Sequence, residues 1–414
     1  MKIGIVCYAS VGGSGIVATE LATSLARRGH HVHVLSSEIP FRLREHSQGV
    51  HFHRVETPAY PLFREPQYAL SLSNSIVQVA RAHALDIVHA HYAVPHAAAA
   101  YLARQILAAS DAGSTAAAGP RGSAPKIITT LHGTDITLVG SDPSYSETVA
   151  FCIDQSDGVT AVSRSLKEDT YRFLPVKSPI EVIPNFLDCA RYAPRYDPAA
   201  RIRYCPPDRY DGLLLHISNF RPVKRLDAVM EVFRRVRERV RAKLVLAGDG
   251  PERARVAQHA AEAGLTEHVE ILGEQDDVRT LLSIGDVFLL PSAQESFGLA
   301  AAEAMACGTP VVASRVGGLP EVITHGDTGF LHAPDDLDGM AASALAILTD
   351  VELRNRLSAA ARATIVERYC EQRIVPMYEE FYARLIGARS DGSADGSAQG
   401  SAPARMHGRP AYGA

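Results

Sequence analysis

Short apolar runs alternate with amphipathic or alanine-rich stretches along most of the chain of 414 residues. Apolar runs of about four to eight residues bounded by turn residues are typical of buried strands, and the stretches between them have helical spacing. The predicted strands cover residues 2–8, 31–36, 51–55, 87–90, 126–131, 157–163, 180–185, 213–218, 243–250, 269–273 and 286–290. Strands that alternate with helices form parallel sheets covered on both faces, so the fold class is α/β.

Breaks in this alternation divide the chain into units. Residues 190–212 are rich in Pro, Arg, Tyr and Asp without apolar periodicity, which is typical of a linker. We therefore predict domains over 1–190 and 213–368, with a linker over 191–212. An amphipathic helix is predicted from about 366 to 385. In the division into domains, this C-terminal helix is given its own segment, residues 369–387. The Ala-, Gly-, Ser- and Pro-rich segment 108–125 predicts a mobile surface insertion, and 388–414 predicts a disordered tail.

Composition narrows the class of protein. A hydrophobic content of 46% is ample for two cores, and a net charge of −4 argues against a nucleic-acid binder. The six cysteines are scattered singly, which favours a reducing compartment and argues against a disulfide framework or a zinc site. We find neither a signal peptide nor an apolar run long enough for a membrane span. These features predict a soluble cytoplasmic protein.

The stretch 291–314 carries the candidate chemistry. A turn with Glu295, Phe297 and Gly298 follows the strand 286–290, and an alanine-rich helix is predicted from Leu299 to residue 306. Free backbone N–H groups and the helix dipole favour an anion such as a diphosphate at this helix start. Glu295 and Glu303 flank it and can accept hydrogen bonds from sugar hydroxyls. The alternative is two solvated glutamates beside an ordinary helix.

A basic turn, NFRPVKR, follows the strand 213–218. Arg221 and Lys224 in this turn can neutralise a diphosphate, the first by a two-pronged contact and the second as a point charge. Taken alone, the turn also fits a solvated basic loop. The diphosphate hypothesis is favoured because this basic turn occurs together with the candidate anion site of the 291–314 stretch, about seventy residues further on.

The first half begins with a strand, a glycine-rich loop and a helix. The loop Gly12-Gly13-Ser14-Gly15 is not the GxGxxG fingerprint, and no acidic residue ends the second strand, so NAD binding is disfavoured. Such a loop can still hold a small anion. After residue 87, His89, His91 and His96 cluster in IVHAHYAVPH, but the absence of a matching carboxylate pattern disfavours a metal site. Substrate contact is the better hypothesis for Tyr92 at this strand end.

The segment ESFGLAAAE resembles the Glu-x7-Glu signature of the retaining glycosyltransferases of family four. The resemblance covers about residues 1–387 and implies the GT-B fold, two Rossmann-like domains facing each other across a cleft. It implies acceptor binding by domain 1–190, nucleotide-sugar binding by domain 213–368, and a C-terminal helix that crosses back to the first domain. The implied catalytic residues are His132, Arg221, Lys224 and Glu295. The implied donor-binding residues are Arg221, Lys224, Gly248, Gln275, Glu295, Phe297, Gly298, Leu299 and Glu303.

A narrower resemblance concerns the acceptor. SVGGSG, SSEIPFR, HAHYAVPH, TTLHGTD and NFRPVKR are similar to the bacillithiol-pathway members of the family, which join N-acetylglucosamine from UDP-GlcNAc to the hydroxyl of L-malate. The small-molecule substrates implied are therefore UDP-GlcNAc and L-malate, with no metal or other cofactor and with neither nucleic acid nor membrane as partner. The acceptor-binding candidates are Gly13, Ser14, Tyr92, Thr130, Asn185, Arg42 and Arg164.

Several alternatives stay open at this point. An inositol phosphate is the competing acceptor, although its phosphate would call for a denser set of cations. A two-domain UDP-GlcNAc epimerase would need carboxylates and histidines in place of Arg221, Lys224 and Glu295. A periplasmic-type binding protein would need a secretion signal. A homodimer is neither required nor excluded.

Overall fold

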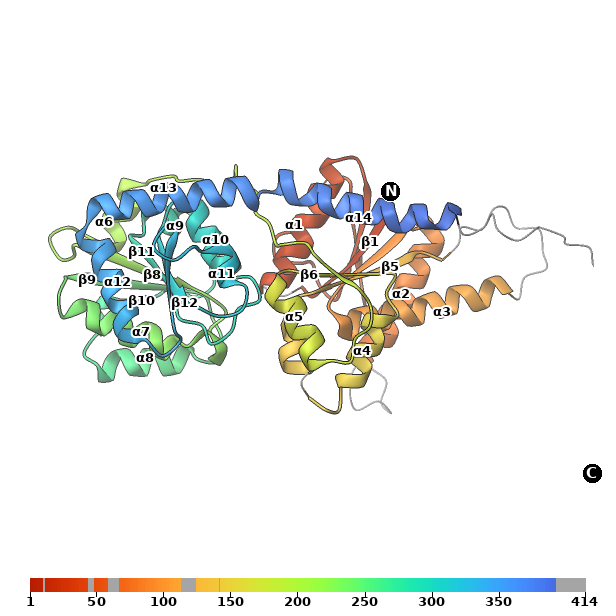
Figure 1. Ribbon diagram of the computed structural model, residues 1–414, viewed down its shortest axis with the longest axis horizontal. Coiled ribbons are helices and arrows are strands. Elements are labelled where there is room, and N and C mark those ends of the chain that lie inside the picture. The colour runs from red at the N-terminus through yellow and green to blue at the C-terminus, as the bar shows by residue number, and fades with distance from the viewer. Residues whose placement is uncertain (10–11, 44–47, 59–66, 113–123, 141, 392–414) are drawn as a thin grey trace, which may run out of the picture.

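Two parallel sheets, one in each half of the chain, organise the molecule (Figure 1). The computed structural model describes residues 1–9, 12–43, 48–58, 67–112, 124–140 and 142–391. The first sheet has the order β3-β2-β1-β4-β5-β6-β7 and the second the order β10-β9-β8-β11-β12-β13, with every described pairing parallel. This is the doubly wound α/β architecture that the alternating pattern predicts.

The central strands of the first sheet are buried, as expected for strands covered on both faces, whereas the edge strand β3 is partly exposed. Its strands are β1 (Lys2–Val6), β2 (His31–Ser36), β3 (Val50–Arg54), β4 (Ile87–His91), β5 (Lys126–Leu131), β6 (Gly158–Ala161) and β7 (Ile180–Val182). Its helices are α1 (Gly13–Arg27), α2 (Tyr68–His83), α3 (Ala98–Ala112), α4 (Ser146–Asp154) and α5 (Arg164–Phe173), with the short turns η1 (Ala93–Ala97) and η2 (Asp135–Val139).

The second sheet repeats this arrangement. Its strands are β8 (Gly212–Ile217), β9 (Ala242–Ala247), β10 (Val269–Ile271), β11 (Val287–Leu290), β12 (Val311–Ser314) and β13 (Gly329–His332). Its helices are α7 (Leu226–Arg237), α8 (Arg253–Glu262), α9 (Arg279–Ile284), α10 (Leu299–Ala306), α11 (Leu319–Val322) and α12 (Leu337–Thr349), with η3 (Pro222–Lys224) and η4 (Thr266–His268). In the segment between the two sheets, Asp197 caps the short helix α6 (Pro198–Tyr204), which the sequence pattern did not predict.

Two consecutive helices span both domains along one side of the molecule (Figure 1). They are α13 (Val351–Arg368) and α14 (Glu371–Asp391), and they meet at Tyr369 and Cys370. Ile374, Tyr378 and Tyr382 of α14 are buried in the core of the first domain, so the chain does return to that domain. The single helix predicted from about 366 to 385 is therefore two helices.

The cysteine prediction needs a correction. Cys189 and Cys370 form a disulfide between residues 181 positions apart, whereas Cys7, Cys152, Cys205 and Cys307 are free and buried. A search for closely spaced pairs cannot detect such a bond, because only the fold brings the two residues together. The disulfide also removes the support that the cysteine pattern gave to a reducing compartment.

Two further predictions concern the surface of the chain. Helix α3 extends to residue 112, so the first five residues of the predicted insertion 108–125 are helical. The remainder of that insertion, apart from residues 124 and 125, and the tail from residue 392 lie outside the described residues. None of the helices in the described ranges is long and apolar enough to cross a membrane.

Candidate active site

The loops at the carboxyl ends of the two sheets meet between the domains. A Cβ placed on Gly13, at the start of α1, would lie 4.0 Å from Leu299 Cδ2, at the start of α10. A Cβ on Gly133, where φ is +113°, would lie 1.8 Å from Ser296 Oγ, so glycine permits this close approach. The N-termini of two helices, one from each domain, therefore face the same crevice. In parallel sheets, this is the edge at which ligands bind.

Glu295 lies in the turn between β11 and α10, and its carboxylate is held in place. Lys224 Nζ donates to Glu295 Oε1 at 2.6 Å, and Ser292 Oγ donates to the same oxygen at 2.9 Å. The side chains of Glu295 and Lys224 are 10% and 20% exposed. A partly buried ion pair of this kind orients both groups, and Glu295 Oε2 makes no hydrogen bond to any described residue.

Glu303 is oriented by residues of the first domain. Arg42 Nη2 donates to Glu303 Oε1 at 3.0 Å, and the hydroxyl of Tyr192 is hydrogen-bonded to the same carboxylate. Arg42 also lies 3.5 Å from Glu20, measured from Nη1 to Oε1. Burial lowers the pKa of Arg42, but Glu303 more than offsets this, so the net shift of the Arg42 pKa is upward. Arg42, a predicted acceptor ligand, thus lies against the predicted ribose ligand.

The start of α10 has the geometry of an anion site. Gly298 has φ of +88°, and a Cβ there would lie 2.4 Å from Leu319 Cδ2, so glycine is required for this entry into the helix. The first hydrogen bond of the helix runs from Ala302 N to Gly298 O, which leaves the amides of residues 299–301 without a partner in the helix. The Phe297 ring is 3% exposed and packs edge-on against Tyr369, so Phe297 can reach a ligand through its backbone only.

The GDG turn after β9 packs against the end of β8. Gly248 has φ of +126°, and a Cβ there would lie 1.8 Å from Ser218 O, so the close approach requires glycine. Gly248 N donates to Gly273 O at 2.7 Å, which ties this turn to the segment after β10. There the Gln275 amide donates to Leu272 O at 3.2 Å and Glu274 O at 3.0 Å. Both predicted donor residues lie at the carboxyl edge of the second sheet.

Tyr92 contacts the glycine-rich loop and lies within electrostatic reach of the basic turn of the other domain. It follows β4 with φ of +95°, and its hydroxyl is hydrogen-bonded to the side chains of Ser14 and Thr134. Burial raises the pKa of Tyr92, while the positive charge of Arg221 opposes this rise. Two predicted acceptor residues are therefore in contact, within electrostatic reach of a predicted diphosphate ligand.

His132 follows β5 and is held as a neutral ring. Its Nε2 lies 2.9 Å from His91 Nδ1, and the two rings stack. Burial, followed by the proximity of His96, lowers the pKa of His132 to about 3. Burial also lowers the pKa of His91, whose Nε2 has no described hydrogen-bond partner. His132 is therefore available for hydrogen bonding but carries no charge near neutral pH.

Three other predicted acceptor residues do not share the contacts of Ser14 and Tyr92. Thr130 is fully buried in β5 and bonds to His89 and Thr160, at 2.6 and 2.7 Å, so direct acceptor contact is disfavoured. Arg164 is the first residue of α5, and its backbone N–H donates to Glu321 of the second domain, while its exposed side chain lines a separate hollow of about 700 Å³. Asn185 is 6% exposed, and its Oδ1 has no hydrogen-bond partner among the described residues.

Sequence reasoning missed the residues that position the site. Tyr192 and Glu20 hold Glu303 and Arg42, and burial raises the pKa of Glu20. Asp135 is buried and accepts hydrogen bonds from the amides of Gly133 and Ala93, at 2.9 and 3.4 Å. Burial raises the pKa of Asp135 to about 6. Asp135 alone had a usable signal, because it lies in the HGTD segment beside His132.

With the fold and site described, the comparisons with known proteins can be stated. The model of Glycosyltransferase Family 4 matches residues 11–191, and that of Glycosyl transferases group 1 matches residues 207–364. The N-acetyl-alpha-D-glucosaminyl L-malate synthase of Bacillus anthracis is 44% identical over 382 residues, covering 92% of this chain and 96% of that protein. The D-inositol 3-phosphate glycosyltransferase of Stackebrandtia nassauensis is 28% identical, with coverage of 84% and 82%.

Solved structures agree on the fold. The sucrose-phosphate synthase of Thermosynechococcus elongatus superposes with a TM-score of 0.75 at 20% identity, covering 94% of this chain and all of the other. Anabaena HepE in complex with UDP and glucose superposes with a TM-score of 0.74 at 20% identity, covering 92% of this chain and 99% of the other. The protein is thus a glycosyltransferase of the GT-B fold. Within that class, the chain belongs to glycosyltransferase family 4.

Proposed function

We propose that this enzyme transfers N-acetylglucosamine from UDP-GlcNAc to the hydroxyl of L-malate. The observation that carries the proposal is the meeting of two helix N-termini at Gly13 and Leu299. Each helix start favours an anion, and this reaction has two: the donor diphosphate at α10 and a malate carboxylate at α1. The name of the Bacillus anthracis relative contains the two groups that this reaction joins, N-acetylglucosaminyl and L-malate, and so supports the proposal.

The donor half of the site performs the main electrostatic task. The diphosphate gains negative charge as the bond from the anomeric carbon to its oxygen breaks. At that point, positive charge comes from Arg221 and Lys224, and oriented dipoles come from the amides of Gly298 and Leu299. The charge of Arg221 acts on the pKa of Tyr92 in the first domain, and Lys224 is ion-paired with Glu295, so both cations lie close to the cleft. Glu295 contacts the hydroxyls of the sugar being moved, and Glu303 the ribose. These groups carry out the transfer without a divalent ion.

The acceptor half orients the malate hydroxyl. Ser14 and Tyr92 bind one carboxylate at the start of α1, where their side chains are already in contact. The hydroxyl oxygen attacks the anomeric carbon on the face that the diphosphate leaves, and the departing phosphate oxygen takes its proton. The anomeric configuration is retained, and no protein nucleophile is needed. Neutral His132 lines the cleft beside the sugar as a hydrogen-bonding group.

The biological setting follows from these substrates. The product, N-acetylglucosaminyl L-malate, is formed in the first step of bacillithiol biosynthesis, which we place in the cytoplasm. The sequence leaves open whether the chain forms a homodimer. Light scattering of the purified protein measures its molar mass in solution and decides this point.

An acceptor panel tests the proposal. UDP release from UDP-GlcNAc is measured with L-malate, D-malate and inositol phosphate, each with and without EDTA. We expect release with L-malate to be fastest and to survive EDTA. Faster release with inositol phosphate would contradict the acceptor, and a loss of activity restored by Mn²⁺ or Mg²⁺ would contradict the electrostatic account. Conversion of UDP-GlcNAc alone to UDP-ManNAc would support the epimerase alternative.

A further inference from the structure

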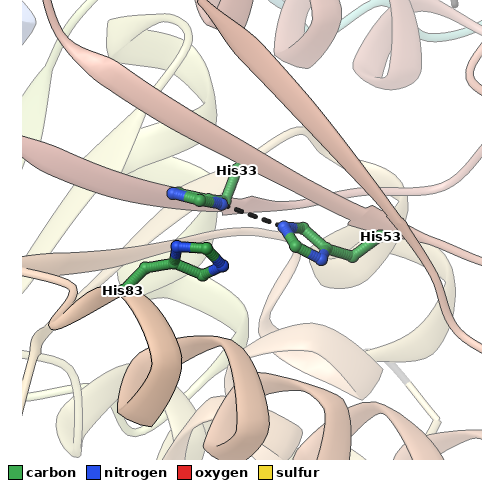
Figure 2. Close-up of side chains that lie close together, drawn as sticks. All are labelled: His33, His53 and His83. Carbon is green, nitrogen blue, oxygen red and sulfur yellow. Dashed lines mark hydrogen bonds between the residues drawn. The ribbon is translucent and has the colours of Figure 1, made fainter.

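Three histidine side chains converge in the first domain, from β2, β3 and the last residue of α2 (Figure 2). His33 Nδ1 lies 2.9 Å from His53 Nε2, and the centroids of the His33 and His83 rings lie 4.2 Å apart. One nitrogen from each of His33, His53 and His83 lies within 4.8 Å of the other two. We refer to these three residues as the histidine trio.

The strand register makes two members of the trio point the same way. His33 pairs with His51 across β2 and β3, and His53 lies two residues further along β3, so these three histidines lie on one face of the sheet. His33 is buried, His53 is half-buried, and His83 is exposed at the end of its helix. Two ligands are therefore fixed by the sheet, and the third is free to adjust its rotamer.

The surroundings of the trio favour neutral imidazole rings, which can bind a metal cation, over protonated rings, which cannot. Burial, and then the proximity of His83, lower the pKa of His33 to about 4, so its ring is neutral near pH 7. Neutral imidazole is the form that binds a metal, and it is a good ligand for zinc, copper and nickel. Within the described ranges, the His33–His53 hydrogen bond is the one hydrogen bond that links members of the trio.

The distances are close to those of a tetrahedral site. Zinc–nitrogen bonds of about 2.0–2.1 Å at tetrahedral angles place two ligand nitrogens about 3.3 Å apart. The His33–His53 pair, at 2.9 Å, needs to open slightly, and His83 needs to approach by rotating its exposed side chain. A water, or His51, whose ring stacks on His33 with centroids 5.1 Å apart, can complete the fourth position.

We propose that His33, His53 and His83 form a structural binding site for one divalent transition metal of the zinc class. The ion ties the edge strand β3 and the end of α2 to β2. Because α2 connects β3 to the parallel strand β4, it ends on the side of the sheet opposite the carboxyl ends. The site is therefore separate from the catalytic crevice and from the histidines His89, His91 and His96 considered in the sequence.

The test uses the full chain without a histidine tag, stripped of metal with EDTA and desalted. Zn²⁺ is titrated by calorimetry, Co²⁺ by visible absorption, and thermal unfolding is recorded with and without Zn²⁺. We expect one equivalent of Zn²⁺ to bind, Co²⁺ to give the d–d absorption of a tetrahedral site, and Zn²⁺ to raise the Tm. None of these readouts depends on which sugar or acceptor the enzyme uses.

Two variants locate the site, and a third is the control. His83→Ala changes an exposed residue and should preserve the fold, as checked by circular dichroism, while weakening Zn²⁺ binding at least tenfold. His53→Ala should do the same, and both should lose the Tm increase. His259→Ala, on α8 of the other domain, should bind Zn²⁺ like the unmodified chain. Failure of the unmodified chain to bind one equivalent of Zn²⁺, or binding by either His53→Ala or His83→Ala as tight as that of the unmodified chain, would overturn the proposal.

Discussion

Arg42 of the first domain and Glu303 of the second form an ion pair between the domains, with 3.0 Å from Nη2 to Oε1. Their side chains are 9% and 7% exposed. A charge pair this deeply buried stays favourable only while both partners are present, because either one alone is left uncompensated. Glu303 is also the predicted ribose ligand. The pair therefore links nucleotide binding to the contact between the domains.

The first prediction concerns Glu303. Glu303→Gln should weaken UDP binding about tenfold or more, because a hydrogen bond from a hydroxyl to a carboxylate contributes about 1.5–3 kcal/mol. Isothermal titration calorimetry with UDP measures the effect. The control is Glu267→Gln, which changes a glutamate whose side chain is 81% exposed on the same domain. Unchanged UDP affinity in Glu303→Gln would remove the ribose role.

The second prediction concerns the Lys224–Glu295 pair, joined at 2.6 Å. Lys224→Ala should lower kcat by about 10²–10³, the usual cost of removing one group that stabilises charge in a transition state. Glu295→Gln should lower kcat with little change in UDP affinity, because the role proposed for Glu295 is to contact the sugar. Arg209→Ala, an exposed cation of the same domain, serves as the control. A Lys224→Ala variant with normal kcat would sink the diphosphate role.

The third prediction concerns the contact between Ser14 and Tyr92. Tyr92→Phe and Ser14→Ala should each raise the KM for malate about tenfold, because each removes one of the hydrogen bonds proposed to hold the malate carboxylate. The kcat should change much less. Steady-state kinetics with malate as the varied substrate measures both values, and Tyr196→Phe, at a residue 65% exposed, is the control. Loss confined to kcat would contradict an acceptor-binding role.

The fourth prediction is a loss of stability in mild acid. Burial lowers the pKa of His89 and of His132 to about 3, and that of His96 to about 4. Below about pH 6.5 the unfolded chain binds protons at these rings while the folded protein does not, so stability falls as the pH drops. Each histidine contributes about 1 kcal/mol per pH unit in that window.

One buried carboxyl opposes this trend. Burial raises the pKa of Asp135 to about 6, so the folded protein binds a proton there before the unfolded chain does, and acid stabilises it. The loss of stability from the three histidines is larger than the gain from the one aspartate. Urea unfolding at about pH 7, 6 and 5 should therefore give a decreasing free energy of unfolding. A constant or rising value would show that these rings are protonated in the folded protein.

The sequence predicted the fold well because its strands are short, apolar and buried on both faces. The strand 31–36 and the helix 299–306 are confirmed as β2 and α10. Strands β12 and β13 were missed, because their four residues each, VVAS and GFLH, give apolar runs too short to separate from loops. The break between α13 and α14 was missed because the two residues that join the helices, Tyr369 and Cys370, include neither glycine nor proline.

The site was predictable only where neighbours in sequence are neighbours in space. The positions of Glu295, Gly298 and Leu299 follow from one strand-turn-helix segment, and the structure has that segment. Pairings over long separations could not be predicted, since nothing local in the sequence specifies them. The Arg42–Glu303 pair, the Cys189–Cys370 disulfide and the histidine trio are all of this kind.

The most direct test of the account is to identify the product made from UDP-GlcNAc and L-malate in the presence of EDTA. Mass spectrometry gives the composition of the product, and proton NMR gives the configuration at the anomeric carbon. The account predicts N-acetylglucosaminyl L-malate with the α configuration of the donor, formed in step with released UDP. A β-linked product, UDP-ManNAc, or no conjugate of malate while another acceptor is consumed would contradict it.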